Sequence, residues 1–357
     1  MGGVQCPCIV RFGFLDKVHE DRNGFGNAEM TNVLVTGATG FTGGYLCRRL
    51  VREGYQVKGL ALPDLDTTDL EKAGVRIVKG DLRKKETLTS AVSGVDQIYH
   101  IAAVYREQDV PRSMFWDVNV NGTRNLLEVA RDARVRRVVH CSTVGVQGEI
   151  ENPPATEETR YNPGDYYQKS KMEGELLALD FFKREGLEGV VIRPVGIYGP
   201  GDTRFLKLFR YIQQGKFRMF GSGNVLYHLT YIDDLVDGIL LAGETPGVEG
   251  EIFTLAGERY TTLNDLVENI AEVLGVRPST RRYPIWPLWT AGALCELVCR
   301  PFRIQPPVYR RRVDFFIKDR AFDISKARRL LGYQPKVDLK EGLRRTAAWY
   351  KEQGLLD

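Results

Sequence analysis

Residues 32–50 have the sequence NVLVTGATGFTGGYLCRRL, and this stretch decides the fold. Its first part, Val33–Val35, is apolar without polar alternation, which predicts a short strand buried on both faces of a parallel sheet. A turn follows at once, in which Gly37, Gly40 and Gly43 recur at every third position. The remaining residues keep apolar side chains at helical spacing, so the stretch predicts a strand, a glycine turn and a helix in immediate succession.

The glycine turn has the chemistry of a pyrophosphate cradle. One glycine lets the chain reach positive φ, a second lets the backbone approach a phosphate closely, and a third lets the helix pack against the strand. The N-terminus of the helix then directs its free N–H groups at the phosphates. Glycine-rich turns also join strands to helices without binding a ligand, so the glycines alone are a weak indication. Together with the flanking strand and helix they predict a dinucleotide site.

Length and composition limit the fold and the partners. At 357 residues the chain forms one large domain or a domain with a smaller lobe. Its net charge of +4 is small and its basic residues are spread along the chain, so charge gives no argument for a nucleic-acid partner. The six cysteines show no C-x-x-C spacing. This pattern fits a reducing cytoplasm and predicts neither a disulfide framework nor a metal site.

Residues 1–30 differ from the rest of the chain. They lack the charged start and the long apolar run of a signal peptide, and several of them are glycines. One hypothesis is that Met30 is the native start and that the residues before it are an extension. The alternative is a genuine, mobile N-terminal arm.

Three further strands are predicted at residues 55–60, 75–79 and 96–103. At the end of the first of these, an acid would bind the 2′-hydroxyl of NAD and an arginine would favour the 2′-phosphate of NADP. Neither stands there, but Asp64 and Asp66 lie just beyond and no basic residue follows closely. The sequence therefore favours NAD as the cofactor without excluding NADP.

The ends of the other two strands also point to the cofactor. Asp81 follows one of them, where it either caps a helix or lies near the adenine. The other runs into Ala102 and Ala103, whose small side chains would let the backbone lie close to a dinucleotide. His100, in the same strand, is expected to be a packed residue rather than a catalyst.

Two segments carry residues suited to acid–base chemistry. A strand over residues 138–141 would deliver Ser142 and Thr143 at its carboxyl end, where open parallel sheets place their chemistry. Farther along, Tyr167 and Lys171 stand four residues apart, so a helix would present both on one face. A cation close to a phenol lowers the pKa of the phenol and makes it usable as an acid or base. Because this spacing is common, a surface tyrosine and lysine is the alternative.

Two more helices are predicted around these segments. One covers residues 115–132, and the other covers residues 235–242, with Asp233 and Asp234 as its caps. Tyr166 also precedes the lysine, but it is not four residues from it, so it is not expected to belong to the pair.

The order of these motifs resembles that of the extended short-chain dehydrogenases/reductases, a family of NAD-dependent epimerases, dehydratases and sterol-type dehydrogenases. The resemblance covers about residues 31–355. It implies an α/β fold in which residues 31–195, with strand contributions from later residues, form a Rossmann-type, doubly wound parallel sheet. Residues 196–357 would then form a smaller, mixed substrate-binding lobe with the C-terminal helices.

The same resemblance implies roles for single residues. Thr143, with Ser142 beside it, would hold the substrate oxygen, and Tyr167 would move the proton. Lys171 would bind the nicotinamide ribose and tune the phenol. Asn119 matches an asparagine for which a structural role and a proton-relay role are both open. The predicted cofactor-binding residues are Gly37, Thr39, Gly40, Phe41, Thr42, Gly43, Asp81, Leu82, Ala102, Ala103, Tyr167, Lys171, Arg193 and Pro194.

The predicted substrate half departs from the nucleotide-sugar members of the family. Gly196 stands where they carry an asparagine for the diphosphate, and Tyr227 stands at their arginine position. Residues 199–212 instead resemble the branch of 3β-hydroxysteroid and sterol-4α-carboxylate dehydrogenases. We therefore expect an NAD(P)-dependent oxidoreductase that transfers hydride at a secondary alcohol or ketone of a hydrophobic, sterol-like small molecule. The alternatives are a nucleotide-sugar epimerase or dehydratase and a redox-sensing binding protein.

Residues 284–302, PIWPLWTAGALCELVCRPF, are rich in apolar side chains, and only Glu296 and Arg300 are charged. They contain three prolines, so they make a poor membrane span. One interpretation is an amphipathic helix packed on the lobe. The other is an apolar flap at the substrate mouth that touches a membrane peripherally, with tryptophan at the interface and arginine toward lipid phosphate. A homodimer formed through two helices, which is common in the family, is a further expectation.

Overall fold

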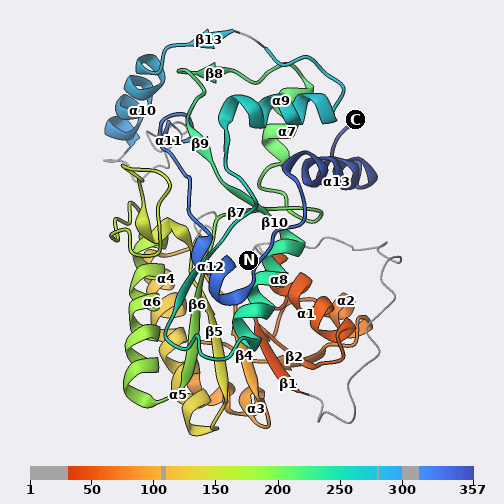
Figure 1. The fold of residues 1–357 in the computed structure, drawn as a ribbon, viewed down its shortest axis with the longest axis vertical. Helices are drawn as coiled ribbons and strands as arrows, with labels where there is room; N and C mark the ends of the chain where they lie inside the picture. The colour runs from red at the N-terminus through yellow and green to blue at the C-terminus, as the bar shows by residue number, and fades with distance from the viewer. Residues whose placement is uncertain (1–30, 106–109, 280, 300–312) are drawn as a thin grey trace.

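A seven-stranded parallel sheet forms the larger part of the molecule, and a smaller lobe lies over one end of it (Figure 1). The computed structural model describes residues 31–105, 110–279, 281–299 and 313–357. The predictions for residues 1–30, including Met30, Cys6 and Cys8, lie outside the described residues. So does the end of the 284–302 stretch.

The strands of the large sheet are β1 (Asn32–Thr36), β2 (Gln56–Ala61), β3 (Arg76–Lys79), β4 (Gln97–His100), β5 (Arg137–Cys141), β6 (Glu188–Pro194) and β11 (Ile252–Leu255). Their order is β3-β2-β1-β4-β5-β6-β11, and every neighbouring pair is parallel. The helices that accompany them are α1 (Phe41–Arg52), α2 (Thr68–Lys72), α3 (Thr89–Val92), α4 (Arg112–Trp116), α5 (Thr123–Asp132), α6 (Tyr166–Glu185) and α8 (Ile232–Glu244). Three single-turn elements are η1 (Lys85–Thr87), the π-helix η2 (Asp117–Gly122) and η3 (Val144–Gln147).

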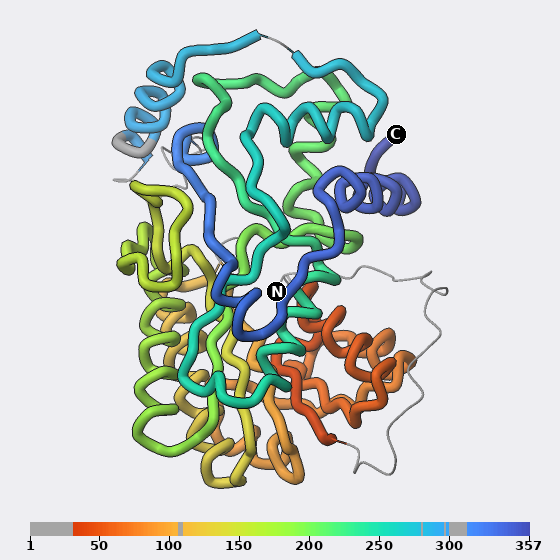
Figure 2. Tube along the Cα trace, in the orientation of Figure 1, coloured from red at the N-terminus to blue at the C-terminus, as the bar shows by residue number. Residues whose placement is uncertain are grey.

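The lobe has shorter elements. Its strands are β7 (Gly196–Tyr198), β8 (Met219–Phe220), β9 (Leu226–Tyr227), β10 (Leu229–Tyr231), β12 (Thr261–Thr262) and β13 (Arg282–Tyr283). Its helices and those of the C-terminal region are α7 (Leu206–Gln213), α9 (Leu263–Val273), α10 (Trp286–Cys299), α11 (Asp314–Ile317), α12 (Ser325–Leu331) and α13 (Leu339–Glu352). After entering the lobe, the chain returns to the sheet through α8 and β11 before it goes back (Figure 2).

Helices cover both faces of the large sheet, as a doubly wound fold requires. Val33 and Val35 of β1 share one hydrophobic core with Leu46 of α1 and Ile239 of α8. Leu34, between the two valines, belongs to the core on the other face, which α5 and α6 cover. Successive side chains of a strand point to opposite faces, so an apolar run without alternation is what a strand buried on both sides needs. The predicted fold class is confirmed.

Three predicted elements have clearly different bounds in the structure, and one of them is the helix expected over 235–242, which spans Ile232–Glu244 as α8. The strand expected over 96–103 ends at His100, because the next residues turn across β1: the Ala102 N–H donates to Thr36 Oγ1 (3.1 Å). The helix expected over 115–132 begins earlier, at Arg112, and its middle is the π-helix η2. Asn119 lies in this wide turn and bonds to the backbone of a different loop. The 3.6-residue period of the sequence cannot register such a local change of helix type.

The predicted capping role of Asp233 and Asp234 is wrong. Helix α8 begins at Ile232, its N-cap residue is Tyr231, and no side chain caps it. The buried carboxylate of Asp234 instead accepts hydrogen bonds from the backbone N–H groups of Lys336 (2.8 Å) and Val337 (3.1 Å). It therefore fastens the C-terminal region to the first turn of α8.

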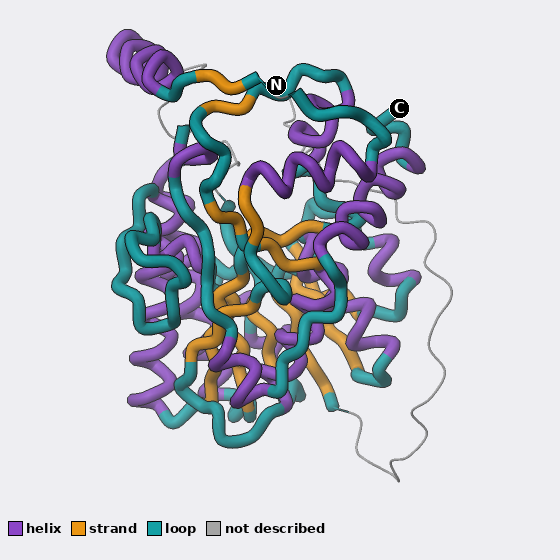
Figure 3. Tube along the Cα trace, turned by 45° about the horizontal axis from the view of Figure 1, so that its top comes forward, coloured by secondary structure: helices purple, strands orange, loops and turns teal. Residues whose placement is uncertain are grey.

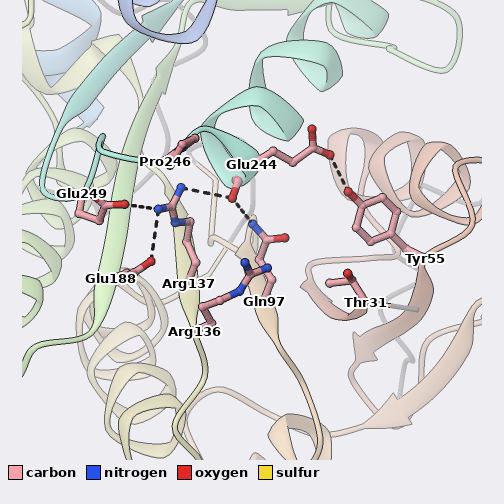
Figure 4. Close-up of a pocket in the computed structure, with 10 residues that line it drawn as sticks. Thr31, Tyr55, Gln97, Arg136, Arg137, Glu188, Glu244, Pro246 and Glu249 are labelled. Atoms are coloured by element: carbon pink, nitrogen blue, oxygen red, sulfur yellow. Dashed lines mark hydrogen bonds and ion pairs between the residues drawn. The ribbon is translucent and has the colours of Figure 1, made fainter. Parts of the chain in front are cut away.

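A polar pocket of about 430 Å³ lies at the amino-terminal end of the sheet, away from the lobe (Figure 4). Arg137, the first residue of β5, donates to the carbonyl oxygens of Gly243 and Thr245 at the end of α8 and pairs with Glu188 and Glu249. A cation at a helix C-terminus complements the helix dipole. The charges of this pocket are therefore used to hold α8 on the sheet.

The two adjacent glycines of α1 provide a matched test of the glycine turn. A methyl group on Gly43 would overlap the carbonyl oxygen of Gly37, whereas a methyl group on Gly44 would first meet the mobile end of Arg48 at 3.2 Å. We expect Gly43→Ala to lower the free energy of unfolding by about 1–3 kcal/mol, as overpacking does, and to abolish NAD binding. Gly44→Ala should be neutral or stabilising by up to about 1 kcal/mol. Urea denaturation and a thermal shift with NAD measure both, and equal effects of the two variants would contradict the packing argument.

Candidate active site

A cavity of about 1440 Å³ separates the carboxyl ends of the sheet strands from the lobe. Every predicted catalytic and cofactor-binding residue except Arg193 lines this cavity: Gly37, Thr39, Gly40, Phe41, Thr42, Gly43, Asp81, Leu82, Ala102, Ala103, Thr143, Tyr167, Lys171 and Pro194. These residues come from the ends of five strands, β1, β3, β4, β5 and β6, and from the start of α6, so the parallel sheet is what gathers them.

The glycine turn leaves an open cradle at the start of α1. Gly37 has a φ of 70°, and a Cβ on it would lie 2.8 Å from Cα of Ala102. Gly40 is the N-cap residue of α1, and no side chain caps the helix there. Side chains at these positions would fill the cradle, and a pyrophosphate on the free helix N-terminus suits it. The residues present therefore fit a dinucleotide, which Gly37, Gly40, Gly43 and the backbone at Ala102 would hold.

The adenosine end of the predicted site differs from expectation. Asp81 caps no helix: its carboxylate accepts from the backbone N–H of Arg83 (3.0 Å) and pairs with the Arg83 guanidinium. The hydrogen bonds from Arg83 hold the pKa of Asp81 below its usual value. Arg83 itself lines the cavity, whereas Asp64 and Asp66 do not. The preference for NAD that was inferred from these two aspartates is therefore not supported by their position, and the sequence argument missed Arg83 because it follows a different strand.

Tyr167 and Lys171 lie one helical turn apart at the beginning of α6. Asp165 caps this helix by accepting from the Gln168 N–H (2.8 Å). Both side chains line the cavity and are nearly enclosed, with 8% of Tyr167 and 3% of Lys171 exposed. Tyr166 is 43% exposed and lies under the guanidinium of Arg112, outside the cavity. The helical spacing thus distinguishes the two neighbouring tyrosines.

The ammonium of Lys171 is anchored to the sheet. Nζ donates to the carbonyl oxygen of Cys141 (2.6 Å), at the end of β5. Burial disfavours the charged form of a lysine, and desolvation lowers the pKa of Lys171. On the same strand end, Thr143 lines the cavity, and its Oγ1 accepts from the Gly145 N–H (3.1 Å). A cation, a phenol and a hydroxyl are therefore held on one wall of the cavity.

Arg193 is not brought to the cavity. Its side chain is 1% exposed and forms a buried ion pair with Glu175 of α6 (Nη2–Oε1 2.5 Å). Glu175 also accepts hydrogen bonds from the hydroxyls of Ser142 and Tyr161. Pro194, the next residue, does line the cavity. Arg193 therefore acts behind the cavity wall, by joining β6 to α6.

Two other polar residues bond to neighbouring elements and do not line the cavity. Asn119 accepts from the Val104 N–H (2.8 Å) and donates to the Val104 carbonyl (3.1 Å) and to Ser170 Oγ (2.9 Å). It does not line the cavity, so its side chain positions the loop that does. His100 is buried between the hydroxyls of Thr36 (2.8 Å) and Thr123 (3.0 Å), which confirms that it is a packed residue.

The side of the cavity that faces away from the glycine turn is largely apolar and aromatic. The lobe and the C-terminal region contribute Ile197, Phe205, Tyr227, Leu229, Trp289, Phe315 and Phe322 to it, and the segment that follows β4 contributes Val104, Tyr105, Val110, Met114 and Val118. Gly196 lies here too, and a Cβ on it would be 2.8 Å from Leu229. Lys318 and Arg320 are the residues of this wall that sequence reasoning missed most clearly, because they lie far along the chain from every motif.

Two kinds of feature are absent from the part of the chain that the structure describes. Within it, the structure has no helix both long enough and apolar enough to span a bilayer. No three histidine, cysteine or acidic side chains of these residues form a metal-binding group. Cys47, Cys141, Cys295 and Cys299 are free thiols.

Comparison with known proteins places this arrangement in a family. The model of the NAD dependent epimerase/dehydratase family matches residues 33–256, more than half of the chain. Sterol demethylase protein B of Methylococcus capsulatus is 30% identical over 90% of this chain and 99% of its own. The 3beta-hydroxysteroid-dehydrogenase/decarboxylase isoform 1 of Arabidopsis thaliana is 30% identical over 88% of this chain and 78% of its own.

A solved structure agrees with these relatives. The dTDP-glucose 4,6-dehydratase DesIV of Streptomyces venezuelae, crystallised with NAD, is 29% identical and has a TM-score of 0.72. The match covers 92% of this chain and 99% of that one. Motifs, fold, cavity and relatives all lead to one assignment. The chain belongs to the NAD-dependent epimerase/dehydratase family, within the extended short-chain dehydrogenases/reductases, and is an NAD-dependent oxidoreductase.

Proposed function

We propose that this enzyme transfers hydride reversibly between NAD and a secondary alcohol or ketone of a hydrophobic, sterol-like small molecule. One observation carries the proposal: Tyr167 and Lys171 are enclosed on the wall of the same cavity that holds the glycine cradle and an apolar lobe surface. The acid–base pair, the cofactor site and the substrate surface are thus continuous. NAD, when bound, supplies the hydride acceptor.

The residues divide the remaining work between them. Thr143 holds the substrate oxygen, and Tyr167 takes the proton from that oxygen during oxidation and returns it during reduction. Lys171 binds the nicotinamide ribose, and its positive charge favours the phenolate of Tyr167. Its anchor on the Cys141 carbonyl limits the movement of the ammonium. The position of the Lys171 ammonium group therefore depends on its hydrogen bond to the end of β5.

The substrate class is inferred from the walls. Apolar and aromatic side chains supply most of the lobe surface of the cavity, which favours a hydrophobic body with few polar groups. Two relatives are named for sterol and hydroxysteroid substrates, which supports the same class. Tyr227 and Gly196 replace the arginine and asparagine of nucleotide-sugar enzymes.

A nucleotide-sugar epimerase or dehydratase is the second candidate, and the likeness to a dTDP-glucose 4,6-dehydratase favours it. In such enzymes the hydride returns to the substrate within one turnover. Net formation of NADH, followed at 340 nm with a sterol alcohol and with a UDP-sugar, separates the two candidates. A third candidate, a redox-sensing binding protein, would bind NAD without any turnover.

Helix α10 supports a peripheral membrane contact. It stands out from the body of the lobe (Figure 3), and Trp286, Leu294 and Val298 are each more than 60% exposed. Trp289 of the same helix lines the cavity. Arg281 and Arg282 precede the helix and are exposed, which suits anionic headgroups. We infer that a cytoplasmic enzyme rests on the membrane through α10, so that an apolar substrate enters beside Trp289.

A homodimer is also part of the proposal. The exposed side of α6 carries Leu176, which is 44% exposed, and pairing of two copies through this helix would bury it.

The adjacent tyrosines of α6 test the catalytic assignment. Tyr167→Phe removes the hydroxyl that transfers the proton, so we expect kcat/KM to fall by about 100- to 10,000-fold while NAD affinity is nearly kept. Tyr166→Phe, on the exposed side of the same turn, should keep full activity. Initial rates of NADH formation and NAD titrations provide both measurements. Unchanged turnover in Tyr167→Phe would refute the assignment.

Two lysines of α6, the buried Lys171 and the exposed Lys169, test whether burial of a charged ammonium group lowers the free energy of unfolding. The native pKa of Lys171 is lowered by desolvation, so the charged side chain destabilises the fold at neutral pH. We expect Lys171→Met to abolish turnover and to raise the free energy of unfolding of the NAD-free protein at pH 7. The gain should shrink as the pH rises from the native pKa toward the unfolded value of about 10.4, because the native lysine then loses its charge. Lys169→Met, at an exposed position, is the control in urea denaturation at pH 7 and pH 10. A Lys171→Met protein that is less stable at pH 7 would overturn this account.

Flotation with liposomes tests the membrane contact. Vesicles that contain phosphatidylglycerol should carry the protein upward in a density gradient, and the double variant Trp286→Asp/Leu294→Asp should stay at the bottom. Leu330→Asp, which changes an exposed leucine on α12, should float like the unaltered protein. Absence of the unaltered protein from the vesicle fraction would remove the membrane contact from the proposal.

A further inference from the structure

The loop between β7 and α7, residues 199–205, lies against the first turns of α1, the helix that begins at the glycine turn. The Tyr45 hydroxyl of α1 donates to the Pro200 carbonyl (2.8 Å). The guanidinium carbon of Arg204 lies 5.6 Å from the centre of the Phe41 ring, a cation–π arrangement. Phe41 is the first residue of α1, and its ring makes a T-shaped contact with Tyr45. A loop of the lobe therefore lies beside the cradle that suits a pyrophosphate.

Contacts within the loop and with α13 fix its shape. Gly201 has a φ of 93°, a conformation that favours glycine. The Asp202 N–H donates to the Gly199 carbonyl (3.1 Å), which closes a tight turn. The hydroxyl of Tyr350, a residue of α13, donates to the Asp202 carbonyl (2.6 Å). The backbone before Arg204 is therefore held from α1 on one side and from α13 on the other.

A buried carboxylate orients the guanidinium of Arg204. Its Nε donates to Oδ1 of Asp202 (2.5 Å), and its Nη2 donates to the Ile197 carbonyl (2.9 Å). The Asp202 side chain is 2% exposed and does not line the cavity, whereas the Arg204 side chain is 29% exposed and does line it. A buried carboxylate needs a cationic partner. Asp202 therefore sets the direction of the guanidinium, and Arg204 remains accessible from the cavity.

A pyrophosphate at the start of α1 needs more positive charge than the helix supplies, because a helix N-terminus carries only a partial charge. Two other cations that line the cavity already have partners: Arg83 is paired with Asp81, and the Lys171 ammonium is anchored at the end of β5. The first N–H groups of a helix are those that an anion binds, and Phe41 is the first residue of α1. Because Arg204 lies against Phe41, its charge is next to the phosphate position.

We propose that Arg204 binds the pyrophosphate of the dinucleotide from the lobe side of the cavity. A planar guanidinium suits phosphate oxygens, and one that is already oriented by Asp202 binds at a lower entropic cost. The inference goes beyond the proposed function and is independent of the substrate class, since it concerns the cofactor alone. The dinucleotide is then held by the sheet domain through the glycine turn and by the lobe through Arg204, so its binding restrains the loop 199–205.

Binding of two fragments of the cofactor to the full-length protein tests the proposal without turnover. ADP-ribose contains the pyrophosphate and is measured by isothermal titration calorimetry, whereas adenosine lacks it and is measured by saturation-transfer NMR, which detects weak binding. Arg204→Gln should weaken ADP-ribose binding by roughly 10- to 100-fold, as loss of a charge-assisted hydrogen bond does. It should leave adenosine binding unchanged. Arg204→Lys, which keeps the charge but loses the planar fork, should have an intermediate ADP-ribose affinity.

A matched control and a measurement on the unaltered protein guard against misfolding of the variants. Lys207→Gln removes an exposed cation of α7 that does not line the cavity, and it should bind both fragments like the unaltered protein. In the unaltered protein, saturating ADP-ribose should slow amide hydrogen exchange in residues 199–208, and adenosine should not. Equal exchange with the two fragments would overturn the proposal. Equal ADP-ribose affinity in Arg204→Gln and the unaltered protein would also overturn it, and so would an equal loss of adenosine binding. Failure to oxidise a sterol alcohol would count against the proposed function alone, because these measurements need no reaction.

Discussion

The buried carboxylate of Glu175 joins the elements that carry the active site. It accepts from Ser142 at the end of β5, from Tyr161 in the loop before α6 and from Arg193 of β6. A buried charge is tolerated only when its partners surround it, and removing one partner is far more costly than the pair is stabilising. Helix α6 therefore cannot slide along the sheet without breaking this cluster. The Glu175 cluster therefore sets the distance from Tyr167 and Lys171 of α6 to the hydroxyls at the end of β5.

Close backbone contacts fix the positions of the loops that form the cofactor half of the cavity. Gly43 lies so close to the Gly37 carbonyl that it tolerates no Cβ, and Gly37 tolerates none because Ala102, after the neighbouring strand β4, lies against it. Asn119 holds the backbone of Val104 at both its N–H and its carbonyl. Each of these contacts is between backbone and a small or polar group. These contacts therefore set the shape of the cofactor cradle, and that shape does not depend on which substrate the lobe binds.

The substrate half is assembled differently. Its walls come from β7, β9, α10, α11 and the segment before α12, which are far apart in the sequence. Side chains from distant segments meet in these walls, as Arg320 and the Tyr227 hydroxyl illustrate. A family can therefore keep one acid–base pair and one cofactor cradle while the lobe selects different substrates. Helix α10 supplies Trp289 to these walls and also exposes the apolar side chains of Trp286, Leu294 and Val298.

The sequence by itself determined the features that depend on local spacing. A buried strand, the glycine turn and the pair Tyr167 and Lys171 can be predicted because the periods of strands and helices fix which side chains share a face. Only the tertiary structure decided where polar groups find their partners. Arg193 was expected at the cofactor and pairs with Glu175, Asp234 was expected to cap α8 and binds the C-terminal region, and the π-helix around Asn119 left no trace in the pattern. The physical reason is that a buried polar group bonds to the partner that packing brings close to it, whatever their separation in the sequence. Arg320 and Tyr227, which are 93 residues apart and hydrogen-bonded, are an example.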